Sequence, residues 1–265
     1  MRCFWIAVLS AAPAFAQPDA HELVRRSIAN GERSWRTSFD YSCIKTDIDR
    51  QFDASSRRVK TASHDVYQIV PLGYGSSFEL HIRHDNEPLP RQEQIKEQQE
   101  LEKRRAESPA QKRRRFEKEE SERSYMKEVP DAFDFRIVGE QTLPTGRAWV
   151  VEATPRPGYR PKSRYARVFP SMRGKLWIDE KDVQWVKADA IAEEPVTFGF
   201  FIARLARGSH IVIEQARLAD GDWVPKRIDA RASARTFVFW NHNFEEDITY
   251  SDYRKGASTL AAAGR

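Results

Sequence analysis

The run Gly-Lys-Leu-Trp-Ile-Asp at residues 174–179 and the run Val-Gln-Trp-Val-Lys-Ala at residues 183–188 stand on either side of a charged turn. The turn is Asp-Glu-Lys-Asp at residues 179–182, and Trp177 and Trp185 flank it. Two short runs rich in aromatic and β-branched residues, joined by a tight polar turn, are typical of a β-hairpin. These residues therefore predict two adjacent antiparallel strands.

The same pattern extends over most of the chain on both sides of this hairpin. Short strands joined by tight polar turns, such as Asp-Gly-Asp at residues 220–222, predict an antiparallel meander. We expect one domain with a curved sheet of about eight to eleven strands. The predicted strands are residues 38–49, 57–70, 76–84, 133–140, 147–154, 174–179, 183–190, 210–218, 223–233, 236–243 and 244–253.

A helix is predicted before the first strand, over residues 19–33. Asp19 is a suitable N-cap, Glu22 follows three residues later, and Leu23, Val24 and Ile28 form an apolar stripe. Gly31 weakens the helix near its end. We expect this helix to pack on the sheet, which gives an α+β, mostly β fold class.

The composition changes abruptly from Arg91 to Glu128, where 12 residues are Lys or Arg and 10 are Asp or Glu. Ser108 is a suitable cap and Pro109 suits the first position of a helix, so two polar helices are predicted. We interpret this segment as a solvated, protruding helical hairpin inserted between strands. So polar a segment buries little apolar area, and we expect it to be dispensable for folding. Docking of a partner and partial disorder are the alternatives.

The N-terminus predicts export. A positive start, an apolar run from Cys3 to Phe15 and the small-x-small site at residues 14–16 form the layout of a signal peptide, residues 1–16, cleaved after Ala16. The alternative is a buried N-terminal helix. No segment reaches the roughly 20 apolar residues that a membrane span needs, so we do not expect a transmembrane protein. Residues 17–255 are then the single domain, and residues 256–265 a flexible tail.

Charge and cysteine content exclude nucleic-acid binders and small scaffolds held by internal disulfides. The formal net charge of +5 is small and spread along the chain, whereas nucleic-acid binders concentrate basic residues on one stripe. Of the two cysteines, Cys3 leaves with the leader, so Cys43 has no partner for an internal disulfide. A buried, inert thiol is one interpretation of Cys43; a reactive or intermolecular thiol is the other.

The sequence contains no motif for catalysis, a cofactor or a metal. His-Glu-x-x-His, Gly-x-Ser-x-Gly and Cys-x-x-Cys are all absent. His81 and His84 are three residues apart on a predicted strand, so we expect them on opposite faces and predict no metal site. We expect a non-catalytic protein; a hydrolase is a remote alternative, because no nucleophile–base pair can be named.

Aromatic residues are dense in the second half of the chain, and they stand at positions that predict large side chains on both faces of the sheet. Each apolar face of such a sheet must be shielded from water by another layer of the protein or by a ligand. The aromatics form an ordinary core, or they line an apolar cavity for an acyl chain or lipidated peptide. The candidates for the cavity are Trp177, Trp185, Phe198, Phe200, Phe237 and Phe239.

The hairpin at residues 174–188 resembles the corresponding hairpin of LolA-like periplasmic proteins. The runs at residues 223–228 and 250–254 resemble that family too, and the resemblance covers roughly residues 134–255. It implies a curved antiparallel half-barrel with helices on its concave side, located in the periplasm. In the carriers of this family the cavity takes lipoprotein acyl chains, and relatives sense envelope stress or bind lipids. The charged insertion departs from the carriers.

Two functional hypotheses follow. The first is a periplasmic protein, carrier-like, that binds a lipid or a lipoprotein acyl chain. The second is a protein-interaction or stress-signalling module of the cell envelope, which docks an envelope protein through the segment from Arg91 to Glu128 and uses the aromatics as plain core.

Overall fold

One antiparallel sheet with helices packed against it makes up the protein. The computed structural model describes residues 18–53, 58–198, 203–236 and 240–256. In chain order the elements are α1 (Ala20–Ser38), β1 (Tyr41–Phe52), β2 (Val59–Gly73), β3 (Ser76–His84), β4 (Glu87–Pro88), α2 (Arg91–Arg105), α3 (Pro109–Arg123), η1 (Ser124–Glu128), α4 (Val129–Ala132), β5 (Phe133–Leu143), β6 (Gly146–Pro155), η2 (Tyr165–Ser171), β7 (Met172–Asp179), β8 (Trp185–Ala192), β9 (Val196–Phe198), β10 (Ala203–Leu205), β11 (His210–Arg217), β12 (Trp223–Thr236) and β13 (Trp240–Lys255).

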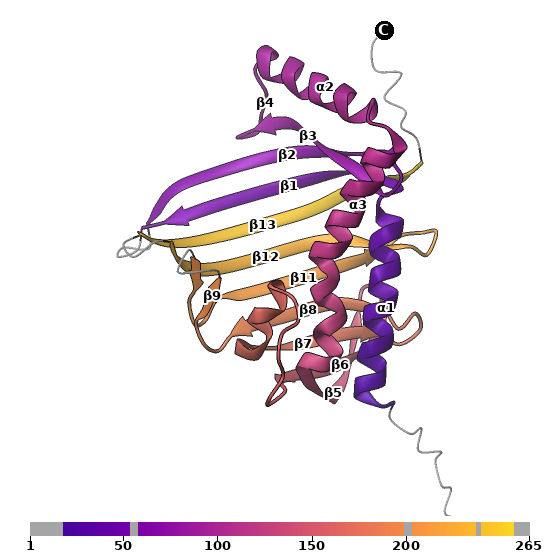
Figure 1. Ribbon diagram of the computed structural model, residues 1–265, viewed down its shortest axis with the longest axis vertical. Coiled ribbons are helices and arrows are strands. Elements are labelled where there is room, and N and C mark those ends of the chain that lie inside the picture. The colour runs from indigo at the N-terminus through magenta and orange to yellow at the C-terminus, as the bar shows by residue number, and fades with distance from the viewer. Residues whose placement is uncertain (1–17, 54–57, 199–202, 237–239, 257–265) are drawn as a thin grey trace, which may run out of the picture.

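The sheet is open and curved, with strand order β4-β3-β2-β1-β13-β12-β11-β8-β7-β6-β5, and β9 and β10 attached beside β12 (Figure 1). Within the described ranges, every pair of strands is antiparallel. The predicted fold class, a mostly β α+β fold with a curved antiparallel sheet, is confirmed.

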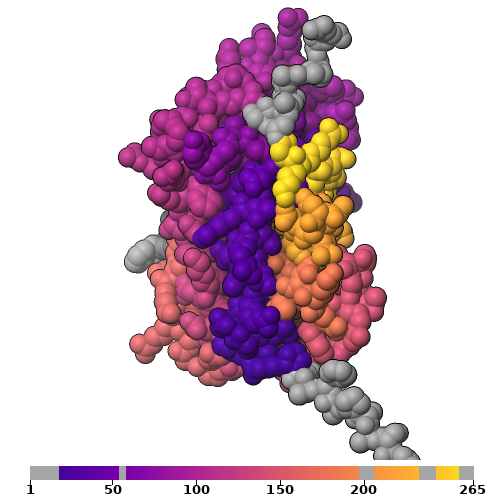
Figure 2. Space-filling view, turned by 90° about the vertical axis from the view of Figure 1, so that its right-hand side faces the viewer, coloured from indigo at the N-terminus to yellow at the C-terminus, as the bar shows by residue number. Residues whose placement is uncertain are grey.

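Helix α1 forms as its sequence predicts and then continues further. The Asp19 side chain accepts a hydrogen bond from the backbone N–H of Glu22 at 2.7 Å, and the apolar stripe is buried against the sheet. The predicted end at residue 33 is wrong, because the helix runs through Gly31 to Ser38. In Figure 2 the exposed side of α1 forms an indigo band of surface. The segment from Arg91 to Glu128 lies on one side of this band, and the ends of the C-terminal strands lie on the other.

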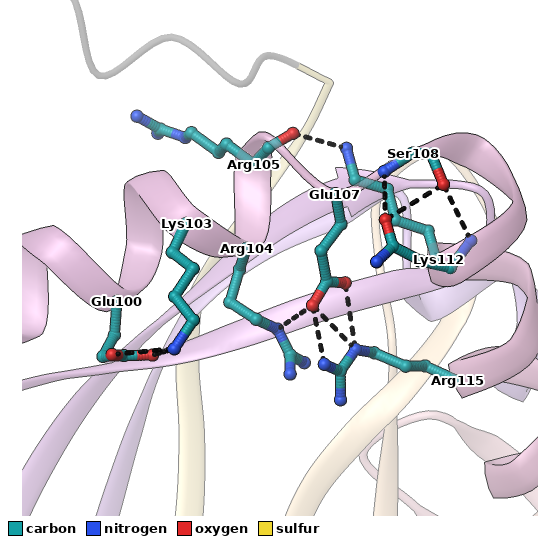
Figure 3. Close-up of polar contacts among 9 residues, drawn as sticks. Glu100, Lys103, Arg104, Arg105, Glu107, Ser108, Lys112 and Arg115 are labelled. Atoms are coloured by element: carbon teal, nitrogen blue, oxygen red, sulfur yellow. Dashed lines mark hydrogen bonds and ion pairs between the residues drawn. The ribbon is translucent and has the colours of Figure 1, made fainter.

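The charged segment folds into two helices as predicted. Ser108 caps α3 with a capping box, and Pro109 occupies the first turn. Charges at the bend hold the two helices together: Arg115 Nη2 lies 2.6 Å from Glu107 Oε1, and Lys112 Nζ donates to the carbonyl of Arg105 at 3.0 Å. Figure 3 shows Glu107 between Arg104 and Arg115 at this bend. Many of the charges therefore stabilise the hairpin itself.

The expectation that this hairpin protrudes is wrong. Helix α3 lies beside α1 across the sheet (Figure 1), where Phe116 stacks on Trp35 with ring centroids 5.4 Å apart. Arg123 Nε donates to Glu32 on α1 at 3.1 Å. On α2, Leu101 is fully buried in a cluster with Val70, Leu72 and Leu80. A few apolar residues thus anchor a mainly polar pair of helices.

The strand boundaries differ most near the C-terminus. The strand predicted at residues 244–253 is present within β13, but the boundary predicted between residues 243 and 244 is wrong, because β12 extends to Thr236 and β13 is continuous from Trp240. Residues 237–239, between these strands, lie outside the described residues, as do the predicted leader and most of the predicted tail. In the described part of the chain, no helix has the length and apolar character to cross a membrane.

Candidate functional site

A pocket lies between the concave face of the sheet and the helical elements that cover it. Its volume is about 290 Å³. The lining comes from strands β5, β6, β7, β8 and β11 and from the helical elements α1, η1, α4 and η2. The residues around it are Ile28, Tyr125, Met126, Val129, Phe133, Ala153, Val168, Phe169, Met172, Arg173, Gly174, Lys175, Leu176, Trp185, Ala188, Asp189, Ala190, Ile211 and Ile213.

Small residues form the floor of the pocket. Ala153, Gly174, Ala190 and Ile211 pair in one row across four strands. A Cβ on Gly174 would lie 2.4 Å from the carbonyl oxygen of Asp189, so only glycine fits where β7 and β8 approach so closely. Three successive positions of the row thus have one side-chain carbon or none. The space that larger side chains would fill remains open.

The neighbouring row closes the floor on one side. Val151, Leu176, Ala188 and Ile213 pair in register across the same four strands. Val151 is fully buried, and Leu176, Ala188 and Ile213 pack against the core cluster that α1 forms with the sheet. The pocket therefore borders the hydrophobic core between α1 and the sheet.

Helical connections form the roof. Tyr125 and Met126 come from η1, at the end of the charged segment, and Phe169 comes from η2. The Tyr125 ring lies tilted against Phe169, with centroids 6.1 Å apart. Burial raises the pKa of the Tyr125 phenol, which keeps this group neutral. The roof and the floor together present an apolar lining.

The charged residues around the pocket belong to strand positions that alternate with the floor. Arg173 and Lys175 flank Gly174, so their side chains point to the opposite face of the sheet. Arg173 pairs with Glu193 at 3.0 Å, and Asp189 contacts His210 Nε2 at 2.8 Å. A ligand in the pocket would meet the backbone of these residues and the apolar side chains of their neighbours.

The six cavity candidates have different places. Trp185 is 6% exposed and lines the pocket. Trp177 does not line it: this residue lies on the opposite face, where its Nε1 donates to Gln141 and the Lys187 ammonium lies 4.9 Å from its ring centroid. Phe198 belongs to β9, but its side chain is not described, and Phe200, Phe237 and Phe239 lie outside the described residues.

Sequence reasoning missed the small residues of the floor and the roof residues of η1 and η2. A glycine inside a strand pattern indicates close approach of another backbone, so Gly174 was a usable signal. Tyr125 and Met126 are among the few large apolar residues of the charged segment, which also marks them. No local signal identifies η2.

The concave face changes from apolar to acidic along one row of the sheet. Ile213, Ile228 and Ile248 pair in register, and the row then continues through Asp47 on β1 and Asp65 on β2. In the adjacent row, Asp49 pairs with Glu246. Burial, with the charge of Asp47, raises the pKa values of both of these carboxyls. Strands β13, β1, β2 and β3 thus carry a negatively charged region of the concave face, separate from the apolar pocket.

Comparison with known proteins gives distant similarity to solved structures. No family model and no curated protein matches the chain. A DUF1329 family protein from Desulfovibrio piger is 12% identical, with a TM-score of 0.35 over 91% of this chain and 95% of that chain. A domain named for outer membrane lipoprotein sorting, from Vibrio parahaemolyticus, is 10% identical, with a TM-score of 0.33 over 89% and 94%. A LolA superfamily protein from Nitrosomonas europaea is 11% identical, with a TM-score of 0.28 over 87% and 93%.

Proposed function

We propose that this chain binds an acyl chain of a lipid or lipoprotein in the pocket between its sheet and its helices, as an exported, non-catalytic protein. The main support is the floor of Ala153, Gly174 and Ala190, which leaves an apolar hollow under a roof of aromatic and aliphatic residues. Binding pockets for small molecules are typically concave and mostly apolar. Export is the prediction that the N-terminal sequence makes.

The volume sets the length of chain that fits. An engineered apolar cavity of about 150 Å³ binds benzene, which has six carbons. A pocket of about 290 Å³ therefore has room for on the order of a dozen carbons. Each buried methylene contributes about 0.8 kcal/mol, which is roughly fourfold in Kd.

A series of straight-chain carboxylic acids tests this proposal. We expect the Kd to fall roughly fourfold with each added methylene until the chain reaches about twelve carbons, and then to level off. Isothermal titration of the purified chain with acids of 8 to 16 carbons, below their micelle concentrations, measures it. Affinity that does not depend on chain length would contradict an acyl site.

The alternative is that the segment from Arg91 to Glu128 docks an envelope protein. Its support is the exposed face of α2, where Leu101 is the buried residue and the charged side chains pair mainly along the helix. Crosslinking from Ile95, an exposed apolar residue on that helix, would test this reading. Capture of one reproducible partner supports docking, and its absence together with chain-length dependence favours the acyl site.

A further inference from the structure

Three side chains converge at the acidic end of the concave face. Asp65 on β2 lies between His81 and His84 on β3: its Oδ1 is 3.0 Å from His81 Nε2 and 2.7 Å from His84 Nδ1. The three potential ligand atoms all lie within 4.8 Å of one another. This spacing is short enough for one ion to contact all three after small side-chain rotations.

A β-bulge brings the two histidines to the same face. Val66 pairs with Arg83 and Tyr67 pairs with His81, so Ile82 is an extra residue on β3. The extra residue reverses the alternation of the strand. The expectation that His81 and His84 point to opposite faces is therefore wrong. His84 then pairs directly with Asp65 in the register.

The surroundings hold the two rings in place. The Tyr67 ring stacks on His81, with centroids 4.7 Å apart. At the turn after β3, Asp85 accepts a hydrogen bond from the backbone N–H of His64 at 3.0 Å, which fixes the end of the strand beside His84. The site is thus built from paired strand positions on either side of the bulge and from a defined turn.

Negative charge accumulates around the three residues. Asp47 stands directly opposite Asp65 on β1, and like charges in such pairs are unfavourable. Lys45 lies 3.6 Å from Asp47 and 3.0 Å from Glu79, so it is shared between two carboxylates. A cation at Asp65 would offset the remaining charge.

We propose that Asp65, His81 and His84 bind a divalent transition-metal ion of the Zn²⁺ type. Two imidazole nitrogens and one carboxylate suit Zn²⁺, Ni²⁺ or Cu²⁺, whereas Mg²⁺ and Ca²⁺ prefer oxygen ligands only. The His84 side chain is 55% exposed, which gives an ion access from solvent and leaves coordination positions open. His81 Nε2 lies 2.7 Å from the Arg83 carbonyl, and metal binding would exchange this contact for the ion.

Calorimetric titration of the tag-free chain with ZnCl₂ tests the proposal. We expect saturable binding of one Zn²⁺ per chain, weakened about tenfold or more in His84→Ala and in Asp65→Asn, and no saturable heat with MgCl₂. His84 is exposed, so its substitution is not expected to affect folding, which circular dichroism of the metal-free variants checks.

Two histidines provide matched controls. His64 is adjacent to Asp65 in the sequence but points to the other face of β2, and His210 contacts Asp189 at 2.8 Å as a simple histidine–aspartate pair. His64→Ala and His210→Ala should leave Zn²⁺ affinity unchanged. The proposal is overturned by a lack of saturable binding, by unchanged affinity in both His84→Ala and Asp65→Asn, or by equal loss in either control.

Discussion

Gly31 allows the Trp185 ring to pack directly against helix α1, and Gly31→Ala tests this contact. A Cβ at position 31 would lie 2.3 Å from Nε1 and 2.9 Å from Cδ1 of Trp185. Carbon contacts are favourable near 3.5–4.0 Å, so the ring or the helix would have to retreat by about 1 Å. Trp185 is buried in the cluster with Val24 and Ile28, which leaves little room for this movement.

Two effects of opposite sign decide the result. Alanine is better than glycine inside a helix by about 1 kcal/mol. Overpacking a filled core costs about 1–3 kcal/mol. The overpacking term is the larger, and we expect Gly31→Ala to lower the free energy of unfolding by about 1 kcal/mol. Urea unfolding followed by far-ultraviolet circular dichroism measures it.

An exposed position in the same helix gives the control. Ala29→Gly should cost about 1 kcal/mol through helix propensity alone, since Ala29 is exposed. Gly31→Ala should cost less stability in the Trp185→Phe background than in the wild type, because the smaller ring relieves the contact. If Gly31→Ala instead stabilises the protein by as much as Ala29→Gly destabilises it, the packing account is wrong.

Three further predictions concern other parts of the chain. Leu101→Ala should cost about 2–5 kcal/mol in thermal or urea unfolding while exposed Ile95→Ala on the same helix stays within about 0.5 kcal/mol, and equal small effects would show that α2 is not anchored. Burial raises the pKa of the Cys43 thiol to about 12, so the native thiol should react with Ellman's reagent at pH 8 only on unfolding. The unfolded thiol ionises near pH 8.5, so the stabilisation that comes from keeping Cys43 neutral in the fold is intact below that pH and is lost as the pH rises toward 12. Fast labelling of the native thiol at pH 8 would refute the burial of Cys43. Protein recovered from the periplasm should have the intact mass of a chain that starts at Gln17, and retention of Met1 in the cytoplasm would end the export prediction.

The sheet could be predicted because its strands and turns are local patterns. The hairpin around residues 179–182, the cap at Asp19 and the break at Ser108 each depend on a few neighbouring residues, and the structure contains all three. Helix α1 passes Gly31 because a tertiary contact with Trp185 compensates for the poor helix propensity of glycine. That contact joins residues far apart in the sequence, so no local pattern indicates it.

The candidate sites were harder to predict, since both depend on register. Trp185 lines the pocket and Trp177 does not, although both flank the same turn. The floor exists because Ala153, Gly174 and Ala190 meet across three strands, and only the pairing of strands shows this. The histidine pair depends on one extra residue in β3, which reverses the side-chain alternation that a regular strand would have.

The central claim is that the pocket over Ala190 binds an acyl chain, and one titration tests it most directly. Displacement of a fluorescent fatty acid by dodecanoic acid would be compared in the wild type, in Ala190→Phe and in Ile191→Phe. Ala190 lines the pocket, whereas Ile191 is 40% exposed on the opposite face of the same strand. With both variants folded by circular dichroism, Ala190→Phe should weaken binding at least tenfold, since its ring occupies the space of several methylenes, and Ile191→Phe should not weaken it. Wild-type affinity in Ala190→Phe, or an equal loss in Ile191→Phe, would contradict the account.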